Sequence, residues 1–98
     1  MTVRIVKLTF REEEIENFKK ILIDSKEKIR AFPGVLYLEM LQCVTDSTIF
    51  FTYSHWETPE DLEAYRNSEL FKNTWAKTKP LFAKPAEAWS SEMLHQLK

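Results

Sequence analysis

The chain has 98 residues and a net charge of −1, and 44% of its residues are hydrophobic. This length is typical of one domain, so we expect a single domain over residues 1–98, and a nearly neutral chain has little electrostatic attraction for nucleic acid. No apolar run approaches the roughly 20 residues that cross a bilayer, and the N-terminus lacks the pattern of a secretory signal. The one cysteine, Cys43, excludes an internal disulfide. We therefore expect a cytoplasmic protein whose partners include neither nucleic acid nor a membrane.

The first third of the chain predicts a strand followed by a helix. Val3–Phe10 is rich in β-branched residues, which favours a strand. The apolar residues that follow recur at helical spacing. They are Ile15, Phe18, Leu22 and Ile29. Pro33 disfavours helical geometry just before it, so the helix should end near Arg30.

The middle of the chain predicts a β-hairpin. Pro33-Gly34 marks a turn, and Val35–Val44 and Thr48–Trp56 have the composition of strands. Thr45-Asp46-Ser47 between them has turn chemistry, and so short a connection joins antiparallel neighbours.

The last third predicts a broken helix and a final strand. Thr58 can cap a segment that runs to about Arg66, and Asn67-Ser68 can cap a second segment over residues 69–78. Ala86–His95 then has the pattern of a strand. The order β-α-β-β-α-β is the ferredoxin-like arrangement, an α+β fold with a four-stranded antiparallel sheet and both helices on one face.

Both faces of the predicted sheet are apolar, whereas a half-solvated sheet alternates apolar and polar residues. In the strand at 35–44, one face would carry Leu36, Leu38 and Met40, and the other Val35, Tyr37, Leu41 and Cys43. Each large side chain left in water forgoes about 1.5–3 kcal/mol of burial free energy. We therefore expect a homodimer with two-fold symmetry, in which two copies bury their sheets against each other.

Two segments suggest a family. The third strand ends in SHWE (residues 54–57), and the broken helix carries DLEAY-RNSELFKNTW (residues 61–75). With the order of elements, they resemble the antibiotic biosynthesis monooxygenase domain over nearly the whole chain. That family builds a dimeric α+β barrel whose third strand typically ends in Trp and an acidic residue, here Trp56-Glu57. The resemblance implies a pocket between the helices and the sheet of each subunit.

The resemblance also implies a range of activities. Family members include oxygenases that act on electron-rich aromatic compounds without metal or flavin, haem-degrading enzymes, isomerases and proteins of no known reaction. Haem degraders use an Asn on the first strand and a His on a helix, and this chain has neither, so we do not expect haem degradation. The chain also has Ser54 where the family often has Glu, and Tyr65 and Leu70 where it often has His.

Five residues are candidates for the pocket. We predict that Tyr65 and Trp75 are catalytic hydrogen-bond donors to a substrate oxygen or a forming peroxide. Ser54, Trp56 and Phe71 are predicted to bind substrate, with Ser54 as a third donor. Each aromatic has a structural alternative. Trp56 could be a wedge between sheet and helix, and Phe71 and Trp75, four residues apart on one helix face, could belong to the core.

The remaining chemistry-bearing residues form no recognisable site. His55 lies between Ser54 and Trp56 in a strand, so it should face the opposite side of the sheet, at the dimer interface. Two histidines and one cysteine show no metal-ligand spacing, and one glycine allows no Gly-rich phosphate loop. We therefore expect no metal and no cofactor.

The function that these features favour is a small dimeric, cofactor-independent monooxygenase acting on a small aromatic or polyketide-like compound. Two alternatives remain open. The same pocket could belong to a non-catalytic module that binds a small ligand, or to an isomerase of the same dimeric superfamily. A fold shared with enzymes does not by itself establish a reaction.

Overall fold

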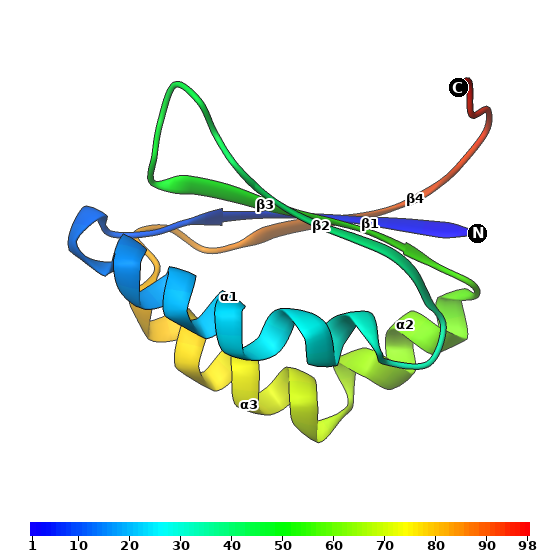
Figure 1. Cartoon of the computed structure of the whole chain (residues 1–98), viewed down its shortest axis with the longest axis horizontal. Coiled ribbons are helices and arrows are strands. Elements are labelled where there is room, and N and C mark those ends of the chain that lie inside the picture. Colours follow the sequence, from blue (N-terminus) through cyan, green and yellow to red (C-terminus); the bar gives the residue numbers. More distant parts are fainter.

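The computed structural model of the chain describes all of residues 1–98. The strands are β1 (Thr2–Thr9), β2 (Val35–Gln42), β3 (Ile49–Trp56) and β4 (Glu87–Glu92). The α-helices are α1 (Ile15–Arg30), α2 (Pro59–Arg66) and α3 (Glu69–Thr78), and single 3-10 turns occupy Glu12–Glu14 and Lys79–Leu81. In Figure 1 the helices form one layer that covers a single face of the sheet.

The sheet is antiparallel throughout and has the strand order β2-β3-β1-β4. This confirms the predicted ferredoxin-like α+β fold. The register aligns side chains in rows across the sheet, and Arg4 of β1 lies opposite Ser54 of β3 and Ser90 of β4. Because side chains alternate along a strand, the even-numbered residues of β1 and β3 face the helices and the odd-numbered residues face away.

The last strand is shorter than the sequence predicts. It ends at Glu92 rather than at His95. The reason is that Glu92 already pairs with Thr2, the first residue of β1, so the residues after it have no strand beside them.

A bulge interrupts β2 between Val35 and Tyr37. Val35 is buried among helix-facing residues, whereas Leu36 is 44% exposed. The prediction that Leu36 shares a face with Leu38, and Val35 with Tyr37, was therefore wrong. A bulge adds one residue to a strand and shifts the alternation of its side chains, which sequence pattern does not reveal.

Side-chain caps fix where α2 and α3 begin. The Thr58 hydroxyl accepts a hydrogen bond from the Asp61 amide at 3.1 Å, and the Ser68 hydroxyl accepts one from the Phe71 amide at 3.1 Å. Each cap satisfies a backbone N–H that has no partner in the first turn of a helix. The two helices therefore begin at the residues that the sequence predicts, and the second cap sets the start of the helix that carries Phe71.

The core between helices and sheet has two clusters. The first contains Leu8, Phe10, Phe18 and Phe50, and the Phe10 and Phe18 rings stack with their centroids 4.0 Å apart. The second contains Val35, Trp56 and Leu62. The clusters lie near opposite ends of β3, so neither cluster fills the middle of the helix-facing side of the sheet.

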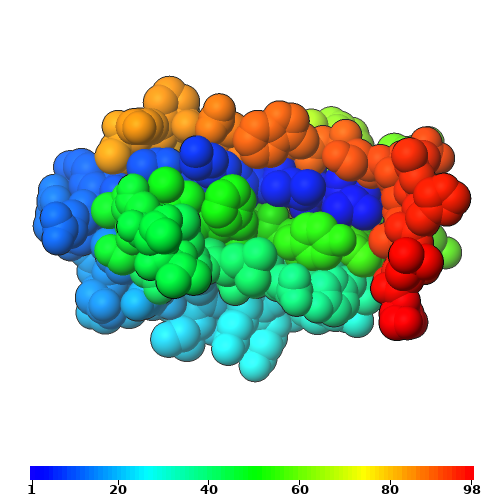
Figure 2. All heavy atoms as spheres, turned by 90° about the horizontal axis from the view of Figure 1, so that it is seen from above, coloured from blue at the N-terminus to red at the C-terminus, as the bar shows by residue number.

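The opposite face of the sheet is uncovered. Figure 2 shows the four strands side by side on this face, with the C-terminal segment at one end of it. Tyr37, Leu41 and Trp89 are 42%, 45% and 48% exposed there. None of the helices combines the length and the apolar character that a membrane-spanning helix needs.

Candidate functional site

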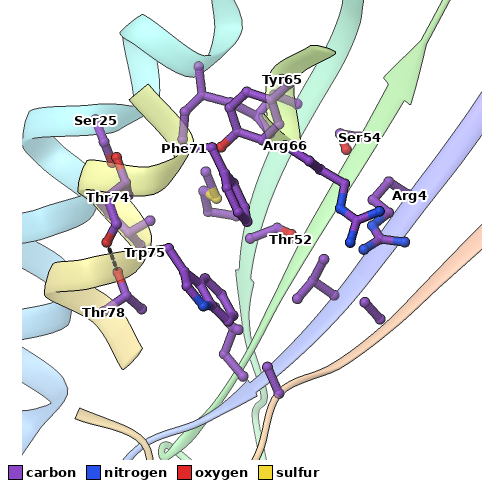
Figure 3. A pocket seen from close by; sticks show the side chains of 18 of the residues that line it. Arg4, Ser25, Thr52, Ser54, Tyr65, Arg66, Phe71, Thr74, Trp75 and Thr78 are labelled. Atoms are coloured by element: carbon purple, nitrogen blue, oxygen red, sulfur yellow. Dashed lines mark hydrogen bonds between the residues drawn. The ribbon is translucent and has the colours of Figure 1, made fainter. Parts of the chain in front are cut away.

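A cavity of about 370 Å³ lies between the helices and the sheet (Figure 3). Of its 22 lining residues, 15 are hydrophobic, which makes the space suited to an apolar body rather than to a solvated ion. Aspartate, glutamate and histidine do not occur among these residues. The cavity therefore contains no side chain that could act as a general base near neutral pH.

The floor of the cavity changes from apolar to polar along β1. Val6 and Leu8 lie toward the C-terminal end of β1, and Arg4 lies toward its N-terminal end. The row across the sheet at Arg4 continues into Ser54 and Ser90, all of which face the helices. A ligand on this floor would therefore meet hydrocarbon at one end and hydrogen-bonding groups at the other.

The roof is an aromatic platform on α3. The Phe71 and Trp75 rings stack with their centroids 5.7 Å apart and their planes 13° from parallel. Figure 3 shows both side chains projecting from α3 into the space above the sheet. Trp75 also packs against the first core cluster, so it has the predicted core role and lines the cavity as well. Such a platform can stack a flat ring.

Tyr65 closes the roof beside this platform. Its ring packs against Trp56 and Phe71, with centroids 5.2 and 5.3 Å away. Its hydroxyl has no hydrogen-bond partner in the chain and yet is not sealed from solvent. Burial raises the pKa of Tyr65 to about 12, because the phenolate would lose hydration. At neutral pH the side chain is therefore a hydrogen-bond donor and not a base.

Ser54 and Trp56 are held together beneath Tyr65. Both are buried, and the Trp56 indole N–H donates to the Ser54 hydroxyl at 2.9 Å. Trp56 therefore has no free donor, and it serves as the wedge of the second core cluster as well as lining the cavity. The Ser54 hydroxyl proton makes no hydrogen bond in the chain and can be donated to a ligand.

The structure thus brings all five predicted site residues to one cavity, and it adds two that the prediction omitted, Arg4 and Arg66. Arg4 shares the parity of Val6 and Leu8, but Val3 and Ile5 make the other face of β1 equally apolar, so the sequence alone did not show that Arg4 faces inward. Burial lowers the pKa of Arg4, the nearby Arg66 lowers it further, and Glu63 acts in the opposite direction.

The cavity opens at the edge of the sheet that β4 forms. All residues of β4 are exposed, including Ala88, which lines the cavity. Arg66, the last residue of α2, is also exposed and lies at this opening with Arg4 (Figure 3). A ligand could therefore enter beneath α3 with its polar end last.

His55 lies outside the cavity, on the uncovered face of the sheet. Its Nε2 atom lies 3.0 Å from the Tyr53 hydroxyl, and its ring packs against Tyr37 with the centroids 5.2 Å apart. This is the side of the sheet that the sequence predicts for His55. In no part of the chain do three His, Cys, Asp or Glu side chains gather as a metal site would require.

Known proteins share this fold. The sequence profile of the antibiotic biosynthesis monooxygenase family matches residues 1–77. No curated protein sequence matches the chain.

Among solved structures, a protein from Nitrosomonas europaea, provisionally named an antibiotic biosynthesis monooxygenase, superposes with a TM-score of 0.91 at 23% identity, over 97% of this chain and 100% of the other. Rv0793 from Mycobacterium tuberculosis gives 0.90 at 14% identity, over 99% and 98% of the two chains. PA3566 from Pseudomonas aeruginosa gives 0.85 at 21% identity, over 96% and 94%. At these identities the likeness concerns the fold.

Proposed function

The chain belongs to the antibiotic biosynthesis monooxygenase family, and from that membership we propose that its cavity binds a small, flat aromatic or polyketide-like compound and oxygenates it without metal or flavin. The observation that carries the proposal is the cavity itself. It is apolar, it has an aromatic platform at Phe71 and Trp75, and the free hydroxyl of Tyr65 lies beside that platform.

The chemistry would depend on the substrate more than on the protein. Because the cavity has no side chain to deprotonate it, the substrate would have to lose its proton to solvent and bind as the phenolate or enolate. Such an electron-rich anion can pass an electron to O₂ directly, so that an anthrone CH₂ becomes C=O and the second oxygen atom leaves as water. The protein would hold the ring in a dry space and donate hydrogen bonds to the charge that develops on oxygen. Tyr65 and Trp75 are the proposed donors to the reacting oxygen, with Ser54 as a third.

The proposal includes a homodimer formed through the uncovered face of the sheet. That face carries Tyr37, Leu41 and Trp89, each more than 40% exposed. Burying these side chains against a second copy would remove apolar surface from water and leave the helix-covered face free for the ligand.

Oxygen uptake tests the reaction. With a panel of anthrones and hydroquinones, the wild-type protein should consume O₂, and Tyr65→Phe or Trp75→Phe should lower the rate by roughly a hundredfold or more, as loss of one donor to a developing oxyanion does. Tyr53→Phe, which removes a hydroxyl from the uncovered face, should leave the rate unchanged. Uptake that neither Tyr65→Phe nor Trp75→Phe alters would rule out these two residues as donors.

A second candidate is a module that binds the same ligands without turnover. It is favoured by the absence of any carboxylate or imidazole from the cavity lining. The same absence argues against an isomerase, which would need a base to move a proton. Binding of the aromatic panel without O₂ consumption would support the module over the oxygenase.

A further inference from the structure

Arg4 is an unusual residue for the floor of an apolar cavity. It is half-buried, it faces the helices, and its Nη1 atom donates to the Ser90 hydroxyl at 2.9 Å. No carboxylate lies within salt-bridge distance of it. A guanidinium has five N–H donors, so most of those on Arg4 remain available on the cavity side of the sheet.

Arg66 supplies a second guanidinium at the same opening. Figure 3 shows the two side chains directed toward each other from α2 and β1, and repulsion from Arg66 contributes to the lowered pKa of Arg4. The only ion pair of Arg66 is with Glu63, at 3.3 Å and with both side chains largely exposed. Exposed pairs of this kind contribute little stability, so Arg66 can turn from Glu63 to a ligand at small cost.

Glu63 is the one carboxylate that acts on these two guanidiniums, and it does not line the cavity, so two positive charges meet one negative charge there. The two guanidiniums are a local concentration of positive charge. The chain as a whole carries a net charge of −1 and so has no general attraction for anions. An anionic group between the two guanidiniums would relieve both the repulsion and the cost of burying Arg4. The planar fork of arginine matches the two oxygens of a carboxylate.

We propose that the ligand of this cavity is an acidic aromatic compound, whose ring lies against Phe71 and Trp75 and whose oxyanion head is held at the opening by Arg4 and Arg66. The inference rests on the proposed function, since it assumes that the cavity binds an aromatic body, and it adds the class of that ligand. Ser54 and Ser90, which flank Arg4 in the sheet, are placed to complete the head-group site.

Calorimetric titration with a matched pair of probes tests the inference. The probes are 2-naphthoate and its neutral isostere 2-naphthamide, with 2-naphthyl phosphate as a second oxyanion. Wild-type protein should bind 2-naphthoate roughly tenfold or more tightly than 2-naphthamide, because charge-assisted hydrogen bonds are the stronger ones. The difference should shrink when the salt concentration is raised. Tighter binding of the phosphate than of the naphthoate would support the site with a phosphate head.

The arginine variants locate the effect. Arg4→Gln and Arg66→Gln should each weaken 2-naphthoate binding by several-fold to tenfold and leave 2-naphthamide binding within about twofold. Lys20→Gln removes the same charge from an exposed position on α1 and is the control. Arg4→Lys retains the charge without the fork and should bind naphthoate with intermediate affinity. Because Arg66 is exposed, Arg66→Gln should fold and tests the proposal even if Arg4→Gln does not fold.

The outcomes separate the two proposals. Equal affinity for naphthoate and naphthamide, unchanged in both arginine variants, would overturn the oxyanion site and leave the aromatic cavity standing. Failure of wild-type protein to bind any of the three probes would overturn the proposed function and this inference together.

Discussion

The properties of Tyr65 show how a single environment sets both a chemical role and a measurable stability. Its ring is packed among aromatic side chains, so ionisation is disfavoured and the pKa rises to about 12. Because the raised pKa belongs to the folded state, its stabilising contribution is present below the unfolded value of about 10 and is lost as pH rises toward 12.

This linkage gives a prediction for Tyr65→Phe. Between about pH 9 and about pH 11, wild-type protein should lose about 1 kcal/mol more of its free energy of unfolding than the variant does. Urea denaturation at the two pH values measures both losses. Tyr37→Phe is the comparison variant. The pKa of Tyr37 is also raised, but chiefly by the hydrogen bond that its hydroxyl donates to Glu39, and the side chain lies on the exposed face. Equal losses in wild type and Tyr65→Phe would show that Tyr65 is not buried in the folded protein.

The inward direction of Arg4 could not be predicted from the sequence alone. The five predicted site residues could be identified from the sequence because four are aromatic and the fifth, Ser54, lies at the aromatic end of a strand. Arg4 lies in an apolar strand where one charge usually means a solvated edge. Its inward direction follows only from the pairing of β1 with β3 and β4, which places it in one row with Ser54 and Ser90.

Among the elements, the break between α2 and α3 is what positions the aromatic platform. The Ser68 hydroxyl accepts from the Phe71 amide and donates to the Tyr65 carbonyl at 2.6 Å, so one side chain joins the end of α2 to the start of α3. The break therefore orients Tyr65 and Phe71 toward each other, with their ring centroids 5.3 Å apart.

Removing this cap should be measurable. Ser68→Ala should lower the free energy of unfolding by about 1 kcal/mol, which is the usual effect of deleting a helix cap, and should also weaken binding of a flat aromatic probe. Chemical denaturation and titration measure the two effects. Ser47→Ala, in the exposed turn between β2 and β3, should change stability by less than about 0.5 kcal/mol. A Ser68→Ala protein as stable as Ser47→Ala would mean that the cap does not set the start of α3.

Element positions could be predicted where local chemistry decides them. Thr58, Pro59 and Ser68 determine the starts of α2 and α3, and the Asp46 carboxylate, which accepts from the Thr48 amide at 3.0 Å, forms the predicted turn of the hairpin. The length of β4 and the bulge in β2 could not be predicted, because both depend on the neighbouring strand rather than on the segment itself.

For the whole molecule, the two faces of the sheet differ in what covers them. The helices cover one face (Figure 1) and line the cavity, and no helix covers the other face, on which Tyr37, Leu41 and Trp89 are exposed. The composition predicted this, because both faces of the strands at 35–44 and 48–56 are apolar. The family resemblance also implied a pocket on the helix-covered face, and the cavity between the helices and the sheet agrees with it.

The proposed dimer gives a prediction at this scale. In sedimentation velocity at micromolar concentration, wild-type protein should sediment as a dimer and Leu41→Asp as a monomer, because a charge buried at an apolar interface is strongly unfavourable. Ile23→Asp places the same charge on α1 at a side chain that is already 67% exposed, and it should remain dimeric. A wild-type protein that sediments as a single subunit would exclude the homodimer.

Both proposals require that a small aromatic molecule binds in the cavity beneath α3. A crystal structure of the protein soaked with 2-naphthoate tests this directly. We expect the ring against Phe71 and Trp75, between α3 and the sheet, with its carboxylate toward Arg4. A ring bound on the uncovered face of the sheet instead, or a cavity filled by those aromatic side chains, would show that the cavity is not the binding site.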